Sequence, residues 1–154
     1  MLLRSPFYIE NFKRDQPYNS LLLIVPYCHK QCVGCHNEHL QDNTLRDFAV
    51  DELVEIYTKN PFVEGVTLGG LEPMYCSHKW WDEFNTFIIK AKVKDLTIYT
   101  HQNFVFRAFS GLDNVYWKTG AHKQGRDKKT ITYQDWKLEL SSDNQRFFRA
   151  SNVV

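Results

Sequence analysis

Short apolar runs alternate with longer amphipathic stretches through the middle of the chain. Residues 20–25 (SLLLIV) are almost uniformly apolar and are followed by Pro26. A run of this length is typical of a strand buried on both faces, as in a parallel sheet. The chain therefore predicts a central strand near its N-terminal end.

The same pattern continues toward the C-terminus. It first predicts a helix with candidate caps Asp47 and Asp51 that ends before Asn60-Pro61, and then a strand at 66–68 running into Gly69-Gly70. A helix over 80–88 and a strand at 95–100 follow. The remaining predicted elements are a brief helix at 104–109, a strand at 115–117 and short strands near 131–133 and 136–140. Residues 1–19 show no clear period and predict an irregular lead-in or a short hairpin. Strand and helix alternate at βαβ spacing, which favours an α/β fold with a mostly parallel sheet.

Three of the predicted strands end in residues that carry chemical groups. A cysteine-rich loop follows Val25, a Gly69-Gly70 turn follows the next strand, and Tyr99-Thr100-His101 closes the third. Parallel sheets place their sites at the carboxyl ends of strands. Chain order alone is therefore expected to bring these groups to one edge of the sheet.

An aromatic stretch dominates the second predicted helix. Its apolar residues, at helical spacing, are Trp80, Trp81, Phe84, Phe87 and Ile88. We interpret them as core packing rather than as a docking face. Cys76, a lone cysteine just before this helix, is interpreted as a packed small side chain.

Length and charge narrow the class of protein. A chain of 154 residues fits one domain, here 1–154, with 119–154 as a C-terminal extension. With 19 Lys and Arg against 18 Asp and Glu, the formal net charge of +1 gives no general attraction to nucleic acid or to a membrane. No apolar run is long enough to span a bilayer, and we expect a cytoplasmic protein with no membrane partner.

Three cysteines stand within eight residues, as Cys28-x3-Cys32-x2-Cys35. This crowding suits a metal centre in a reducing compartment better than disulfides. A zinc ion would need a fourth ligand from His29, His36, His39 or Cys76. A [4Fe-4S] cluster accepts three thiolates and keeps one iron open to another ligand. The spacing favours the cluster and leaves zinc as an alternative.

A second motif, Gly69-Gly70-Leu71-Glu72-Pro73, follows a predicted strand. Glycines at such a turn allow positive φ and let the backbone approach a ligand, while Glu72 places an acceptor at the sheet edge. On its own the motif is an ordinary strand-to-helix turn. Beside the cysteine loop it indicates a binding site.

The two motifs together resemble the radical S-adenosylmethionine superfamily. Gly34-Cys35-His36-Asn37 is similar to the activating proteins of anaerobic ribonucleotide reductases. Further similar elements are Ile98-Tyr99-Thr100, residues 116–120 (YWKTG) and residues 141–146 (SSDNQR). The similar elements extend over residues 20–148, most of the chain.

The resemblance implies an open, partial (β/α) barrel of the radical adenosylmethionine type in a single domain. It implies that Cys28, Cys32 and Cys35 hold a [4Fe-4S] cluster at which S-adenosyl-L-methionine is reductively cleaved to methionine and a 5′-deoxyadenosyl radical. The radical would take a hydrogen from a glycine of its partner, the glycyl-radical subunit of anaerobic ribonucleoside-triphosphate reductase. An electron donor such as flavodoxin is also implied.

The resemblance further assigns the cofactor-binding residues. Gly69, Gly70 and Glu72 match the motif that receives the methionine amino group, and Asn37, Tyr99, Thr100 and Lys118 are expected at the same site. No catalytic side chain is assigned. The chain departs from the pattern at Leu71, where many members have a glycine, at Val115, where activases often have Asp, and at His101, which replaces a common Gly.

Two other functions remain open from the residues alone. One is an activase of another glycyl-radical enzyme. The other is a non-enzymatic zinc-binding interaction module, in which the basic segment 122–129 contacts nucleic acid or an acidic protein surface. A solvated loop is an equally good interpretation of that segment, and we expect no nucleic-acid partner.

Overall fold

The computed structural model describes residues 1–9, 18–25, 45–70, 72–102, 112, 114–121, 123, 125–133, 136–140 and 142–149. Its elements are β1 (Leu2–Leu3), β2 (Pro6–Ile9), β3 (Ser20–Val25), β4 (Arg46–Asp47), α1 (Val50–Lys59), β5 (Gly65–Gly70), the 3₁₀ turn η2 (Pro73–Tyr75), α2 (His78–Ala91), β6 (Asp95–Thr100), β7 (Asn114–Thr119), β8 (Lys129–Tyr133), β9 (Trp136–Leu140) and β10 (Arg146–Arg149). The brief helix predicted at 104–109 lies outside the described residues.

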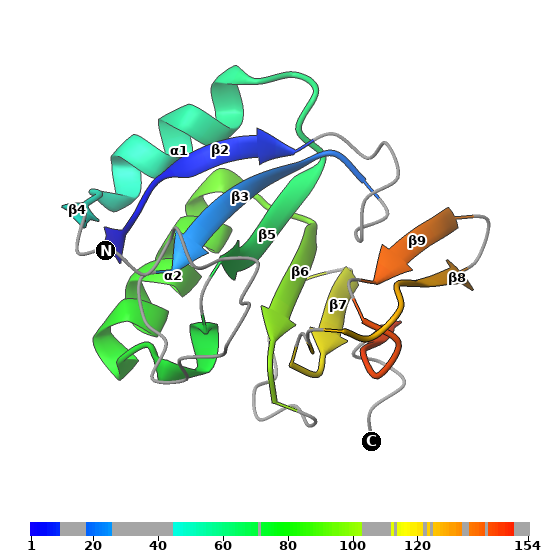
Figure 1. Ribbon diagram of the computed structural model, residues 1–154. Helices are drawn as coiled ribbons and strands as arrows, with labels where there is room; N and C mark the ends of the chain where they lie inside the picture. The colour runs from blue at the N-terminus through cyan, green and yellow to red at the C-terminus, as the bar shows by residue number, and fades with distance from the viewer. Residues whose placement is uncertain are drawn as a thin grey trace.

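The central sheet has six described strands in the order β10-β7-β6-β5-β3-β2 (Figure 1). The four inner strands β3, β5, β6 and β7 are parallel, as their apolar runs predicted. The two outer strands are antiparallel to their neighbours: β2 pairs with β3, and β10 pairs with β7. The sheet is therefore mixed and open.

The expected partial (β/α) barrel is wrong. A barrel of that type continues by adding further parallel βα units, which would have to pair beyond β3 or β7. Here antiparallel strands from the predicted lead-in and C-terminal extension occupy both of those positions. The described residues contain only two α-helices, so the chain is a small mixed α/β protein.

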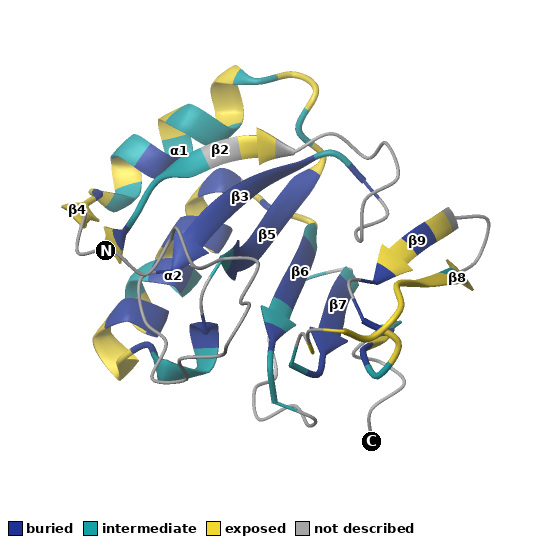
Figure 2. Cartoon of the chain, in the orientation of Figure 1, coloured by how far each residue is buried: buried dark blue, intermediate teal, exposed yellow. Residues whose placement is uncertain are grey.

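Both helices cover one face of the sheet, where the larger core lies (Figures 1 and 2). Every second residue of the inner strands points to this face, among them Leu23, Leu68, Ile98 and Trp117, all 0% exposed. The predicted aromatic helix is confirmed as core packing: its five named apolar residues are buried, and Phe84 is 0% exposed. Figure 2 shows β3 and β5 as the most continuously buried strands.

The ends of the helices show how local sequence sets their bounds. Helix α1 stops at Lys59, before Asn60-Pro61 as predicted, but its N-cap is Ala49 and neither predicted aspartate caps it. Helix α2 begins after Ser77, whose hydroxyl accepts from the backbone N–H of Trp80 at 3.2 Å.

The opposite face carries a second, smaller core under the hairpin β8–β9. Leu138 and Leu140 pack with Tyr116 and Phe147, and the rings of Tyr116 and Phe147 stack at 5.6 Å between centroids. This hairpin was predicted as two short strands. It covers the sheet near β7 and β10, while β10 itself was missed by the sequence analysis.

A polar row crosses the same face at the amino ends of the strands. The hydroxyl of Thr67 donates to Ser20 at 2.8 Å, and the hydroxyls of Tyr18 and Thr97 lie 2.6 Å apart. These side chains are at most 5% exposed. Burial raises the pKa of Tyr18 well above its usual range, and the bond to Thr97 only partly opposes this.

None of the described helices is long and apolar enough to cross a membrane.

Candidate functional site

The carboxyl ends of the four parallel strands lie at one edge of the sheet, as predicted for the first three. Val25 of β3 pairs with Gly70 of β5, and Thr100 of β6 pairs with Thr119 of β7. The cysteine motif begins three residues after Val25 in the chain. Three of the proposed site segments therefore start from neighbouring strand ends.

The proposed metal ligands Cys28, Cys32 and Cys35 lie outside the described residues, as do Asn37 and Leu71. Among the side chains that the structure describes, no three His, Cys, Asp or Glu residues gather as a metal site. The predicted assignment of the three cysteines and of Asn37 stays a prediction. The other site residues, from β5, β6 and β7, are described below.

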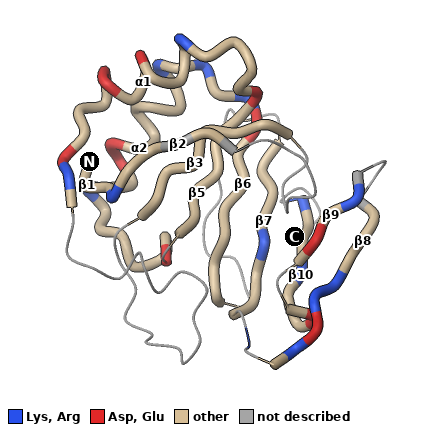
Figure 3. The backbone as a smooth tube through the Cα atoms, turned by 45° about the horizontal axis from the view of Figure 1, so that its top comes forward, with Lys and Arg blue, Asp and Glu red and all other residues tan. Residues whose placement is uncertain are grey.

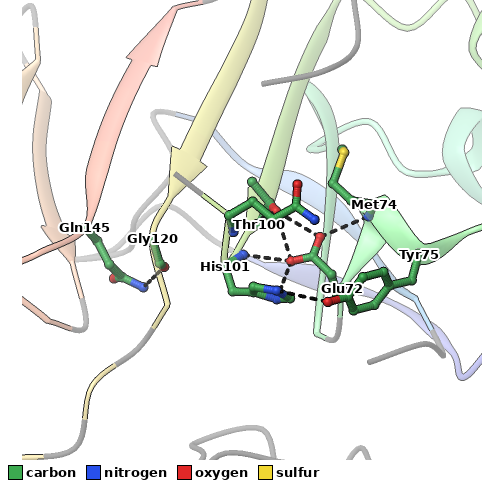
Figure 4. A network of polar contacts seen from close by, with 8 residues as sticks. Glu72, Met74, Tyr75, Thr100, His101, Gly120 and Gln145 are labelled. Carbon is green, nitrogen blue, oxygen red and sulfur yellow. Dashed lines mark hydrogen bonds and ion pairs between the residues drawn. The ribbon is translucent and has the colours of Figure 1, made fainter. Parts of the chain in front are cut away.

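Glu72 forms the centre of the polar network at this edge (Figure 4). The residue is 2% exposed and caps η2, where its Oε2 accepts from the backbone N–H of Met74 at 2.9 Å. The hydroxyl of Thr100 lies 2.9 Å from Oε1 and 2.8 Å from Oε2. The carboxylate thus joins the segment after β5 to the last residue of β6.

His101 contributes two further donors to the same carboxylate. Its backbone N–H and its ring Nδ1 each lie 2.7 Å from Oε1 of Glu72. Because a carboxylate oxygen only accepts, a contact this short favours the hydrogen on Nδ1. The ring's other nitrogen, Nε2, lies 3.3 Å from the hydroxyl of Tyr75. Carboxylate, imidazole and phenol form a continuous chain of polar contacts (Figure 4).

Gly69 and Gly70 serve different purposes. Gly70 has a φ of 83°, the positive backbone angle that the sequence analysis expected of this turn. Gly69 makes room for neighbouring side chains: a Cβ there would lie 3.1 Å from Cδ2 of Tyr99 and 3.2 Å from Cδ1 of Leu22. Side-chain atoms of Tyr99 and Leu22 therefore crowd the position that a side chain of residue 69 would take.

Lys118 lies beside Tyr99 on the face opposite the helices. The two residues are register partners on β7 and β6, and Nζ lies 4.1 Å from the centre of the Tyr99 ring. The lysine is only 6% exposed. A buried ammonium over an aromatic face is a favourable cation–π arrangement, and it puts a positive charge next to the strand ends.

The segment 142–146 holds the turn that follows β7. The side-chain amide of Gln145 donates to the carbonyl of Gly120 at 3.1 Å, and that of Asn144 donates to Ala121 at 2.9 Å. Gly120 has a φ of 99°. The Asn-Gln pair is thus a clamp on the end of β7, a contact that chain position alone did not reveal.

The basic segment is largely exposed and partly paired. Arg126 forms an ion pair with Asp143, and Nζ of Lys128 lies 3.2 Å from Glu139. Figure 3 shows acidic and basic positions interleaved around β8 and β9. These contacts favour the solvated-loop interpretation of the described part of the segment. His122 lies outside the described residues.

Cys76 is 9% exposed and belongs to the main core. Its burial agrees with the interpretation as a packed small side chain.

Sequence reasoning missed three donors to Glu72: the backbone N–H of Met74 and both N–H groups of His101. His101 was noted only for replacing a glycine. Its position directly after β6, next to the segment that follows β5, was the available signal, because adjacent parallel strands end side by side.

Comparison of the chain with protein-family models, with curated proteins and with solved structures gave no match. The resemblance to radical adenosylmethionine activating proteins therefore depends on the motif residues themselves.

Proposed function

We propose that the chain is a radical S-adenosyl-L-methionine enzyme that activates a glycyl-radical enzyme. Its partner in this proposal is the glycyl-radical subunit of anaerobic ribonucleoside-triphosphate reductase, and its electron donor is a flavodoxin-type protein. The support comes from the cysteine and Gly-Gly-Leu-Glu-Pro motifs and from the edge of the sheet at which their strands end. The overall fold adds none, since the sheet is not a barrel.

One observation carries the proposal furthest. Glu72, which the motif assigns to the methionine amino group, is a buried carboxylate at the carboxyl end of β5, and its neighbouring strand β3 leads directly into the cysteine motif. A buried carboxylate is costly unless it is paired with donors. A buried carboxylate after the strand next to the one that precedes a three-thiolate motif in the chain suits a ligand that presents both a metal-binding group and an N–H donor.

The thiolates that the cysteine motif offers fit a [4Fe-4S] cluster. Three thiolates from Cys28, Cys32 and Cys35 would bind three irons of a [4Fe-4S] cluster and leave the fourth for an exogenous ligand. When bound, the cluster supplies the electron that cleaves adenosylmethionine to methionine and a 5′-deoxyadenosyl radical. The chain's own task is to bind and orient the nucleoside and to keep water away.

The described residues divide this task among them. Glu72 accepts from the amino group, and Thr100 fixes the position of the carboxylate. Tyr99 and Lys118 line the opposite face at the same strand ends, where the lysine's charge attracts the methionine carboxylate. Gly70 allows the backbone to turn between β5 and Glu72.

The test is anaerobic reconstitution with iron and sulfide. The expected protein holds four irons per chain and, with dithionite, produces methionine and 5′-deoxyadenosine from adenosylmethionine. Protein that retains zinc, takes up no iron and cleaves no adenosylmethionine would instead establish the zinc-binding module.

The partner requires a separate measurement. Mixing the reduced protein with the reductase subunit and adenosylmethionine should produce a glycyl radical detected by electron paramagnetic resonance. Cleavage of adenosylmethionine without a radical on this subunit, but with one on another glycyl-radical enzyme, would reassign the partner and leave the chemistry in place.

A further inference from the structure

The carboxylate of Glu72 has no acceptor position to spare. Three hydrogen-bond donors point to it, the backbone N–H of Met74, the hydroxyl of Thr100 and the backbone N–H of His101, and the ring Nδ1 of His101 lies 2.7 Å from Oε1 as the fourth polar neighbour. A carboxylate offers about four acceptor positions. An incoming amino group can therefore bind Glu72 only if one of these four groups leaves.

One of the four groups is free to leave. The N–H of Met74 is fixed by the 3₁₀ turn η2, and the N–H of His101 belongs to the backbone next to β6. The hydroxyl of Thr100 is on a residue only 5% exposed, and it also accepts from Gln102 N–H at 3.2 Å. The imidazole of His101 is 22% exposed and rotates about side-chain bonds. It is the donor that can be exchanged.

We propose that the His101 imidazole occupies the amino-group position on Glu72 in the ligand-free protein and that adenosylmethionine displaces it. This inference rests on the proposed function. It explains how a carboxylate that is 2% exposed stays compensated in both states: an N–H donor of the chain is replaced by an N–H donor of the ligand. His101 is thus a positioning residue that competes with the ligand.

Two consequences follow for recognition. The resting contact lowers the apparent affinity for adenosylmethionine, because the ligand must first release the ring from Glu72 and from Tyr75. It also raises selectivity. A nucleoside without the amino acid part provides no N–H donor to replace the imidazole on Glu72, so His101 stays in place.

The experiment is titration calorimetry on the anaerobically reconstituted protein without reductant, so that no cleavage occurs. The probes are adenosylmethionine and 5′-methylthioadenosine, which lacks the amino acid part. We expect His101→Ala to bind adenosylmethionine about tenfold more tightly and 5′-methylthioadenosine unchanged. His78→Ala, at an exposed histidine of α2, should change neither.

Two further variants make the result specific. In Glu72→Gln/His101→Ala the tightening should disappear, because the gain comes through the carboxylate. Tyr75→Phe removes only the hydroxyl near Nε2 and should tighten adenosylmethionine binding two- to threefold. If His101→Ala does not fold, Tyr75→Phe decides the question.

If the imidazole of His101 instead supports the site or contacts the ligand, its removal does not tighten the binding of adenosylmethionine. Unchanged or weaker adenosylmethionine binding by the folded His101→Ala protein, or by Tyr75→Phe where His101→Ala does not fold, overturns the exchange and leaves the proposed function standing. Failure of the reconstituted wild-type protein to bind adenosylmethionine overturns the function and this inference together.

Discussion

The ring of Tyr99 packs against Gly69, with Cδ2 only 3.1 Å from where a Cβ of residue 69 would lie. Gly65, at the other end of β5, is enclosed more tightly: a Cβ there would lie 2.5 Å from the backbone carbonyl oxygen of Asp95 and 2.6 Å from Cε2 of Tyr18. A side chain can rotate away from an added methyl group, whereas the backbone of a central strand cannot. Gly65 and Gly69 therefore differ in what they tolerate.

We predict that Gly65→Ala lowers the free energy of unfolding by about 3 kcal/mol and Gly69→Ala by about 1 kcal/mol. Urea unfolding of the two variants and the wild type measures both values. Equal losses would mean that Tyr99 is held as rigidly as the sheet itself.

A second pair of glycines separates backbone strain from crowding. Gly120 and Gly125 have positive φ angles of 99° and 81°. A Cβ on Gly120 would lie 3.3 Å from the backbone oxygen of Asn144, whereas one on Gly125 would meet nothing within 4 Å. Gly125→Ala should cost about 1 kcal/mol and Gly120→Ala about 2 to 3 kcal/mol, measured by urea unfolding. A smaller loss at Gly120 than at Gly125 would contradict the clamp formed by Asn144 and Gln145.

The buried phenol of Tyr18 predicts a loss of stability at alkaline pH. Burial raises its pKa well above 10.0 in the folded protein, while the unfolded chain titrates near that value. The neutral phenol therefore stabilises the fold fully below pH 10, and this contribution falls by up to about 1.4 kcal/mol per pH unit above it.

Tyr18→Phe should make the unfolding free energy depend less on pH between about 10 and 11 while costing about 1 kcal/mol at neutral pH for the lost bond to Thr97. Burial also raises the pKa of Tyr57, which is only half-buried. Tyr57→Phe should therefore remove a smaller part of the dependence of the unfolding free energy on pH. Urea unfolding at pH 9, 10 and 11 compares the three proteins. An identical slope in wild type and Tyr18→Phe would contradict the assignment.

The cysteines divide into two classes with different expected effects. Single Ser substitutions of Cys28, Cys32 or Cys35 should abolish iron uptake on anaerobic reconstitution, since a cluster bound by two thiolates is not retained. Cys76→Ala should keep the iron content and lower stability by about 1 kcal/mol, because its side chain belongs to the core. Loss of metal in Cys76→Ala would favour the zinc centre in which Cys76 is the fourth ligand.

The parallel centre of the fold was predictable because each of its strands is a short apolar run between polar segments. Ser20–Val25 and Asp95–Thr100 have the predicted bounds, whereas β5 extends beyond the predicted strand at 66–68 to include Gly65, Gly69 and Gly70. The outer strands were not predictable in this way. β2 and β10 have four residues each, too few for alternation to stand out, and their pairing depends on residues distant in the chain.

The candidate site was predictable to the level of the strand ends. Chain order brings Gly70 and Thr100 to one edge, as expected. The contacts between His101 and Glu72 were not predictable, because the spacing of apolar residues along the chain does not determine side-chain rotamers. The packing of Tyr99 against Gly69 was not predictable for the same reason: the missing side chain of Gly69 accommodates Tyr99, a neighbour on the adjacent strand.

The antiparallel outer strands also affect how the chain behaves toward copies of itself. Apolar parallel strands such as β3 would invite edge-to-edge aggregation if their backbone groups were unpaired. The outermost described strands are instead short, and they begin with Pro6 in β2 and Arg146 in β10, with Arg149 at the far end of β10. Proline and charged residues at a sheet edge discourage intermolecular pairing, so the aggregation-prone centre is shielded by strands poorly suited to extend it.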